Sequence, residues 1–69
     1  MNRKIYIKGW TCYEKLTGEL HEINVYLSND SYEVRVDGEF YGTYDSKFHA
    51  FEEVEDIAKL YKWSAFCPV

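Results

Sequence analysis

Apolar and polar side chains alternate along two neighbouring stretches of the chain, residues 23–27 and 32–36. A period of two is typical of strands that bury one face. The apolar positions are Ile23, Val25, Leu27, Tyr32, Val34 and Val36. A two-residue turn at Asn29-Asp30 would pair Val25 with Val34 and keep all the apolar side chains on one face. The pattern therefore predicts an antiparallel hairpin.

A second turn follows the second of these strands. A two-residue turn there would place Phe40 opposite Arg35, on the polar face. A three-residue loop over residues 36–38, with Gly38 in the left-handed conformation, places Phe40 opposite Val34 on the apolar face. Because a shift of one residue moves every side chain to the other face, we predict the three-residue loop. The last strand of this hairpin then covers residues 39–44.

Residues 46–62 show the spacing of an amphipathic helix. Its apolar stripe contains Ala50, Phe51, Val54, Ala58 and Tyr61. Asp45 or Ser46 can cap the first turn by accepting a backbone N–H bond. We expect this helix to pack on the apolar face of the sheet.

Residues 4–13 and 19–28 read as two more strands, and the connection between them is open to two interpretations. A five-residue loop places Ile5 and Ile7 on the apolar face, whereas a four-residue loop buries Trp10 and exposes both isoleucines. We favour the five-residue loop. Short connections make sequential strands neighbours. The chain is therefore predicted to be a single α+β domain, residues 1–69, with a four-stranded antiparallel meander and one C-terminal helix packed on one face (ββββα). The apolar tail should fold back, with Phe66 on the helix or a sheet edge.

One helix covers only one face of such a sheet, so the other face is left for a partner. The chosen registers place four large aromatic and two basic side chains there, residue types common at binding hot spots. We predict a protein-binding sheet face formed by Tyr6, Lys8, Trp10, Tyr26, Arg35 and Tyr41. The same aromatics could instead stack on unpaired bases, which makes single-stranded nucleic acid an alternative partner.

The helix offers a second candidate surface. The chain has 12 Asp and Glu against 8 Lys and Arg, which disfavours a partner held mainly through phosphates. We predict a protein-binding acidic helix face formed by Glu52, Glu53, Asp56, Leu60 and Trp63. Such a face would fit a basic groove on another protein, for example a nucleic-acid-binding enzyme.

The sequence predicts no catalytic residues, metal ligands or cofactor. His21, His49, Cys12 and Cys67 lack the close spacing of a zinc site. The polar start after Met1 and the absence of a long apolar run predict a cytoplasmic protein without a membrane segment. In such a protein the two cysteines are expected as thiols, and an oxidising compartment would allow a disulfide between them.

In its size, acidity and ββα ending, the chain resembles the small acidic proteins encoded by phages and mobile elements, which often inhibit host enzymes by binding them. The leading hypothesis is a non-enzymatic protein-binding module that inhibits or modulates another protein. The alternatives are a single-stranded nucleic-acid-binding module and a self-associating structural protein, for example a homodimer.

Overall fold

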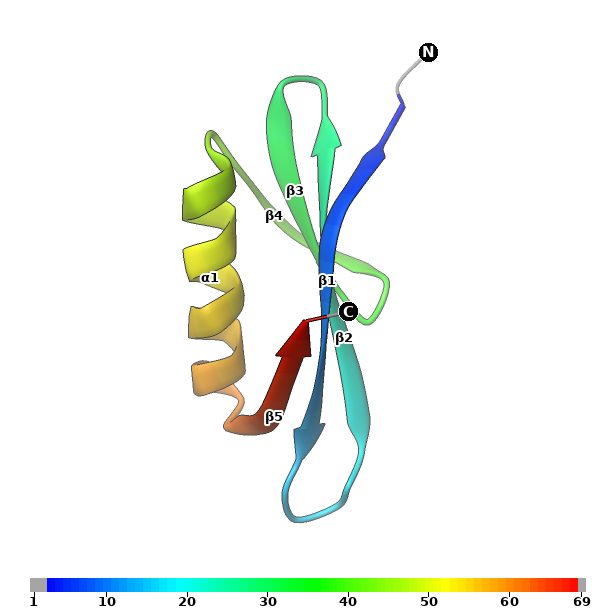
Figure 1. Ribbon diagram of the computed structural model, residues 1–69, viewed down its shortest axis with the longest axis vertical. Coiled ribbons are helices and arrows are strands. Elements are labelled where there is room, and N and C mark those ends of the chain that lie inside the picture. The colour runs from blue at the N-terminus through cyan, green and yellow to red at the C-terminus, as the bar shows by residue number, and fades with distance from the viewer. Residues whose placement is uncertain (1–2, 69) are drawn as a thin grey trace.

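The computed structural model describes residues 3–68, with side chains described for residues 3–64. The strands and the helix follow one another in the predicted order, and one strand is added after the helix (Figure 1). The elements are β1 (Ile5–Glu14), β2 (Leu20–Ser28), β3 (Ser31–Val36), β4 (Glu39–Tyr44), α1 (Lys47–Leu60) and β5 (Trp63–Pro68). The sheet order is β4-β3-β2-β1-β5, and every pair of neighbours is antiparallel. The α+β meander with one helix on one face is confirmed.

The fifth strand was not predicted. The expected apolar tail pairs with β1 and so extends the sheet beyond the meander. The predicted positions of the Phe66 and Cys67 side chains lie outside the described part of the chain. In the described part, no helix has both the length and the apolar character needed to cross a membrane.

The β2–β3 hairpin has the predicted register. Val25 pairs with Val34, and Asn29 and Asp30 both adopt positive φ, at 51° and 64°. Two consecutive left-handed residues define the turn type that matches the twist of a two-residue hairpin.

The predicted three-residue loop between β3 and β4 was wrong. Asp37 and Gly38 form a two-residue turn, with φ of 52° and 84°, and Phe40 pairs with Arg35. Phe40 is accordingly 59% exposed rather than buried. The register then shifts by one residue at a β-bulge, at Tyr41, and Tyr44 packs against the core at the end of the strand.

A second bulge decides the position of β1. Tyr6 pairs with Tyr26 as predicted, but Lys8 pairs with Val25, so Ile7 is the extra residue. From Lys8 onward β1 has the register expected for the alternative with a four-residue loop, and Trp10 is only 6% exposed. The predicted exposure of Trp10 was therefore wrong, because a bulge exchanges the two faces of a strand.

The core lies between the sheet and α1. It consists of Trp10, Cys12, Ile23, Val25, Val34, Ala50, Val54 and Ile57. Fully burying an aliphatic side chain of this size stabilises a fold by about 1.5–3 kcal/mol. Ser46 is the helix cap, since its Oγ accepts the N–H of His49 at 3.1 Å. The buried residues of α1 hold it against the sheet, and the end of the helix leads into β5 (Figure 1).

Candidate functional site

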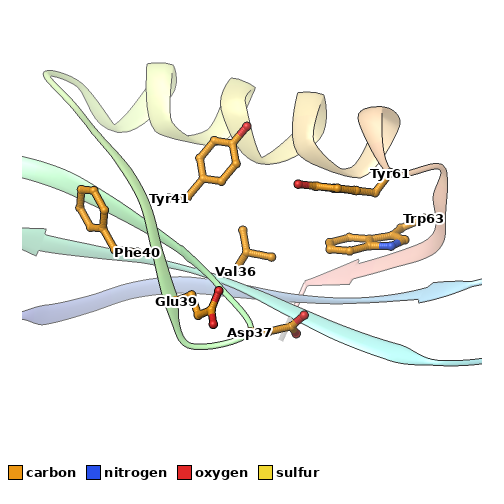
Figure 2. A pocket seen from close by; sticks show the side chains of 7 residues that line it. All are labelled: Val36, Asp37, Glu39, Phe40, Tyr41, Tyr61 and Trp63. Atoms are coloured by element: carbon orange, nitrogen blue, oxygen red, sulfur yellow. The ribbon is translucent and has the colours of Figure 1, made fainter.

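A pocket of about 380 Å³ lies between the end of α1 and the β3–β4 hairpin. Its lining contains four aromatic side chains and two carboxylates. The lining residues are Val36, Asp37, Glu39, Phe40, Tyr41, Tyr61 and Trp63. Figure 2 shows Val36 on the sheet between Tyr41 of β4 and Tyr61 at the end of the helix. We call this cavity the hairpin pocket.

The chain reversal after α1 builds the aromatic wall of the hairpin pocket. The N–H of Tyr61 donates to the carbonyl of Ile57, and Lys62 adopts a left-handed φ of 58° that leads into β5. Tyr61 and Trp63 then stack, with ring centroids 4.9 Å apart (Figure 2). His21, from β2, stacks on Trp63 at 4.1 Å and 8° between ring planes. These three rings, the aromatic stack, hold the wall in one arrangement.

Asp37 is fixed beside the aromatic stack, at the sheet side of the hairpin pocket. Its Oδ1 accepts the backbone N–H of Glu22 at 2.9 Å, and its Oδ2 lies 2.8 Å from Nδ1 of His21. Partial burial raises the pKa of Asp37, but the hydrogen bonds from His21 and Glu22 outweigh it, and the net pKa is lowered. The carboxylate is therefore ionised at neutral pH and can only accept, so Nδ1 of His21 donates.

The hairpin pocket is open and negatively charged. Phe40 is 59% exposed, Tyr61 50% and Tyr41 40%. Glu39 is exposed as well, and no lining residue carries a positive charge. Large exposed aromatic residues that line one cavity are typical of a binding site.

Three of the residues predicted for the sheet face do share the face away from α1: Tyr6, Tyr26 and Arg35. The rings of Tyr6 and Tyr26 meet edge to face, with centroids 5.8 Å apart. The guanidinium of Arg35 contacts the carboxylate of Glu33 and donates to the carbonyl of Gly38 at 2.9 Å. This face is therefore smaller and less basic than predicted.

The other three predicted sheet-face residues lie on the helix side. Trp10 packs edge to face on Phe51 of α1, with ring centroids 5.3 Å apart. Nζ of Lys8 lies 5.5 Å from the centre of the Trp10 ring. Tyr41 lines the hairpin pocket. The bulges at Ile7 and Tyr41 account for all three corrections.

One buried carboxylate pairs with two basic side chains of the open face. Glu33 is 7% exposed and contacts both Arg35 and Lys4, the latter at 3.0 Å. Burial raises the pKa of Glu33, but the hydrogen bonds and charges of Arg35 and Lys4 outweigh it and lower the pKa overall. Both cations are therefore already paired within the chain.

The predicted acidic helix face is assembled only in part. Glu52, Asp56 and Leu60 are exposed at i, i+4 spacing along α1, and Glu53 is half-buried. Trp63 does not join them, because it begins β5 and belongs to the aromatic stack.

The residues considered for zinc do not form one site in the described structure. Cys12 is buried, and Nδ1 of His49 lies 3.4 Å from Asp45 at the helix start. One other group has suitable geometry, since Glu14, Glu19 and His21 each place a ligand atom within 4.8 Å of the others. Nitrogen and carboxylate oxygen suit divalent ions, so these three residues could hold one.

Several residues of the hairpin pocket were not predicted as functional. Asp37, Glu39 and Phe40 had been assigned only to a turn and a strand, and Tyr61 to the buried stripe of the helix. The available signal was the sequence of the turn itself, in which the acidic residues Asp37 and Glu39 directly precede the aromatic residues Phe40 and Tyr41.

The fold and the pocket define a small α+β protein with an exposed pocket that is both acidic and aromatic. Comparisons with protein-family models, curated proteins and solved structures find no match.

Proposed function

We propose that this chain is a small non-enzymatic protein-binding module that inhibits or modulates its partner by occupying a basic segment of it. The observation that supports the proposal is the hairpin pocket, with exposed aromatic walls and two carboxylates. Aromatic side chains supply much of the energy of protein interfaces, and carboxylates select a partner of opposite charge.

The charge of the chain supports the same partner. The formal net charge is −4, and two of the carboxylates that contribute to it line the hairpin pocket. Such a field attracts basic proteins and speeds their association. A basic segment that normally contacts nucleic acid would be blocked while it is bound. We place this activity in the cytoplasm.

The nucleic-acid alternative has less support. Stacking on the open sheet face would rely on Tyr6 and Tyr26, because Trp10 is in the core. Lys4 and Arg35 are both paired with Glu33, so they are poorly available for phosphate contacts.

The test is affinity capture from a bacterial lysate, with and without nuclease. The tagged chain is compared with Tyr61→Ala in the hairpin pocket, Tyr26→Ala on the open face, and the Glu52→Lys/Asp56→Lys pair on the helix. The proposal expects a stoichiometric protein that survives nuclease and is lost in Tyr61→Ala, while circular dichroism shows an unchanged fold. Capture lost with nuclease and in Tyr26→Ala would refute it in favour of nucleic acid. A dimer in ultracentrifugation and no captured protein would refute it in favour of self-association.

A further inference from the structure

We propose that the hairpin pocket is a recognition site for an arginine side chain of the partner, an inference that rests on the proposed function. Arginine is long and amphipathic, with an apolar stem and a planar cationic head. The pocket presents apolar side chains on the sheet and hydrogen-bond acceptors around them.

The two parts of the pocket match the two parts of arginine. Val36 offers apolar contact for the methylene stem, and the rings of Tyr61 and Trp63 lie beside it (Figure 2). The carboxylates of Asp37 and Glu39 and the hydroxyl oxygens of Tyr41 and Tyr61 can accept hydrogen bonds. Figure 2 shows the Tyr61 side chain extending from the helix end toward Tyr41, so the hydroxyls lie on the helix side and the carboxylates at the opposite rim.

The charges and acceptors of the pocket disfavour anionic and purely apolar ligands. An anion would meet two carboxylates and no cation among the lining residues. A purely apolar ligand would cover the acceptors without replacing their hydrogen bonds to water, which disfavours its binding. The volume of about 380 Å³ is at the small end of ligand sites, which suits one side chain rather than a whole helix.

One carboxylate is fixed and the other is available. Asp37 is held by His21 and Glu22, so it supplies a constant field without reorganising. The Glu39 side chain is exposed, and it has no hydrogen bond or ion pair with any residue that the structure describes. Glu39 is therefore the group that can form a new charge-assisted pair with a guanidinium.

The preference for arginine over lysine follows from geometry. Acceptors surround the cavity on more than one side, and guanidinium has five N–H donors in a fixed plane, whereas ammonium is a compact point charge. The aromatic stack presents a rigid wall, because His21 and Tyr61 both pack on Trp63. A preformed wall lowers the entropic cost of binding.

The experiment is an NMR titration of the ¹⁵N-labelled chain with three small probes. These are Nα-acetyl-argininamide, Nα-acetyl-lysinamide and the uncharged isostere Nα-acetyl-citrullinamide. We expect the arginine probe to shift the Trp63 indole N–H and the Glu39 and Tyr41 amides, with the lysine probe several-fold weaker and the citrulline probe silent. Trp63→Phe assigns the indole signal.

Matched variants separate a specific site from general attraction. Glu39→Gln should weaken the arginine probe about fivefold or more, since a charge-assisted bond is lost. Glu52→Gln makes the same change on exposed α1 and should have little effect. Equal weakening by both variants, equal shifts with arginine and lysine, or no shifts at the pocket would each overturn the proposal.

The two proposals fail in different ways. A captured partner whose retention is unchanged in Glu39→Gln would overturn the arginine pocket and leave the protein-binding function standing. Specific binding of the arginine probe supports the pocket even where lysate capture refutes the proposed function.

Discussion

Replacement of Trp10 by alanine is the most direct test of the β1 register. If the bulge at Ile7 is present, this indole lies in the core, 6% exposed and edge to face on Phe51. If β1 instead kept the register of Ile5 and Tyr6 along its whole length, Trp10 would point to solvent on the open face. The same substitution therefore has very different costs in the two registers.

The expected magnitude follows from burial. Removing a buried tryptophan costs about 3–5 kcal/mol, which includes the cavity that it leaves. A domain of 69 residues has a total stability of about 3–10 kcal/mol. Trp10→Ala should therefore leave the chain largely or partly unfolded at 25 °C. Trp10→Phe keeps a ring in the core and should cost about 1–2 kcal/mol, which stays measurable.

Urea unfolding followed by far-UV circular dichroism measures the free energy of unfolding of Trp10→Phe, and the spectrum without urea shows how much of Trp10→Ala is still folded. Phe48→Ala is the matched aromatic control, because Phe48 is 75% exposed on α1, and its cost should be within about 0.5 kcal/mol. A cycle that combines Trp10→Phe with Phe51→Leu should show coupling of about 0.5–1.5 kcal/mol from the ring contact. A cost for Trp10→Ala as small as that of Phe48→Ala would refute the bulge.

Three further substitutions test other parts of the fold. Glu33→Gln should lower the free energy of unfolding by about 1–3 kcal/mol at neutral pH, because it removes the charged partner of Arg35. The pKa of Glu33 is lower in the folded than in the unfolded chain. Its contribution to the free energy of unfolding is therefore complete above the unfolded pKa and is lost as the pH falls through the folded pKa. The stability of Glu33→Gln should lack this part of the acid dependence. Asp30→Gly should raise the thermal midpoint and the free energy of unfolding, the latter by up to about 1 kcal/mol, because Asp30 has φ 64° and glycine adopts positive φ without strain. A lower thermal midpoint would contradict the turn geometry. Ser46→Ala should cost about 1 kcal/mol in urea unfolding through loss of the bond from the His49 N–H, with Ser46→Asp as the control that restores it.

The elements and one hairpin could be predicted because their signals are local. Apolar and polar residues alternate in β2 and β3 without interruption. Burying the apolar residues of both strands on one face requires Val25 to pair with Val34, so this register could be predicted. Ser46 directly precedes the residues with helical spacing, and it was one of the two capping residues predicted. Each of these inferences needs only neighbouring residues.

The bulges were missed because a bulge changes the face on which alternating residues lie. In β1 the apolar residues Ile5 and Ile7 occupy odd positions, whereas the buried Trp10 and Cys12 occupy even ones. No single register satisfies both sets, and this change of parity was itself the sign of an inserted residue. In β4 the same reasoning applies to Tyr41, the inserted residue after the two-residue turn.

The hairpin pocket could not be predicted because two segments far apart in the sequence build it, residues 36–41 and 61–63. Trp63 was predicted as a binding anchor, but on the helix face rather than beside Val36. Its position depends on the pairing of β5 with β1, for which the six residues of β5 carry no strong alternation. Tyr61 ends the helix at the point where the chain reverses, so its helical spacing did not predict its exposure.

The pairing of β5 with β1 also sets an order of assembly. The three hairpins of the meander join neighbours in sequence, whereas Glu14 against Trp63 closes a loop that contains most of the chain. Long loops cost more entropy to close, and contacts between distant residues form late in folding. The aromatic stack is therefore expected to be completed last and, in the native state, to open first. Amide hydrogen exchange should be faster in β5 than in β2, and a ligand in the hairpin pocket should slow it. Ligand binding in the hairpin pocket would thus change how often β5 opens at the edge of the sheet.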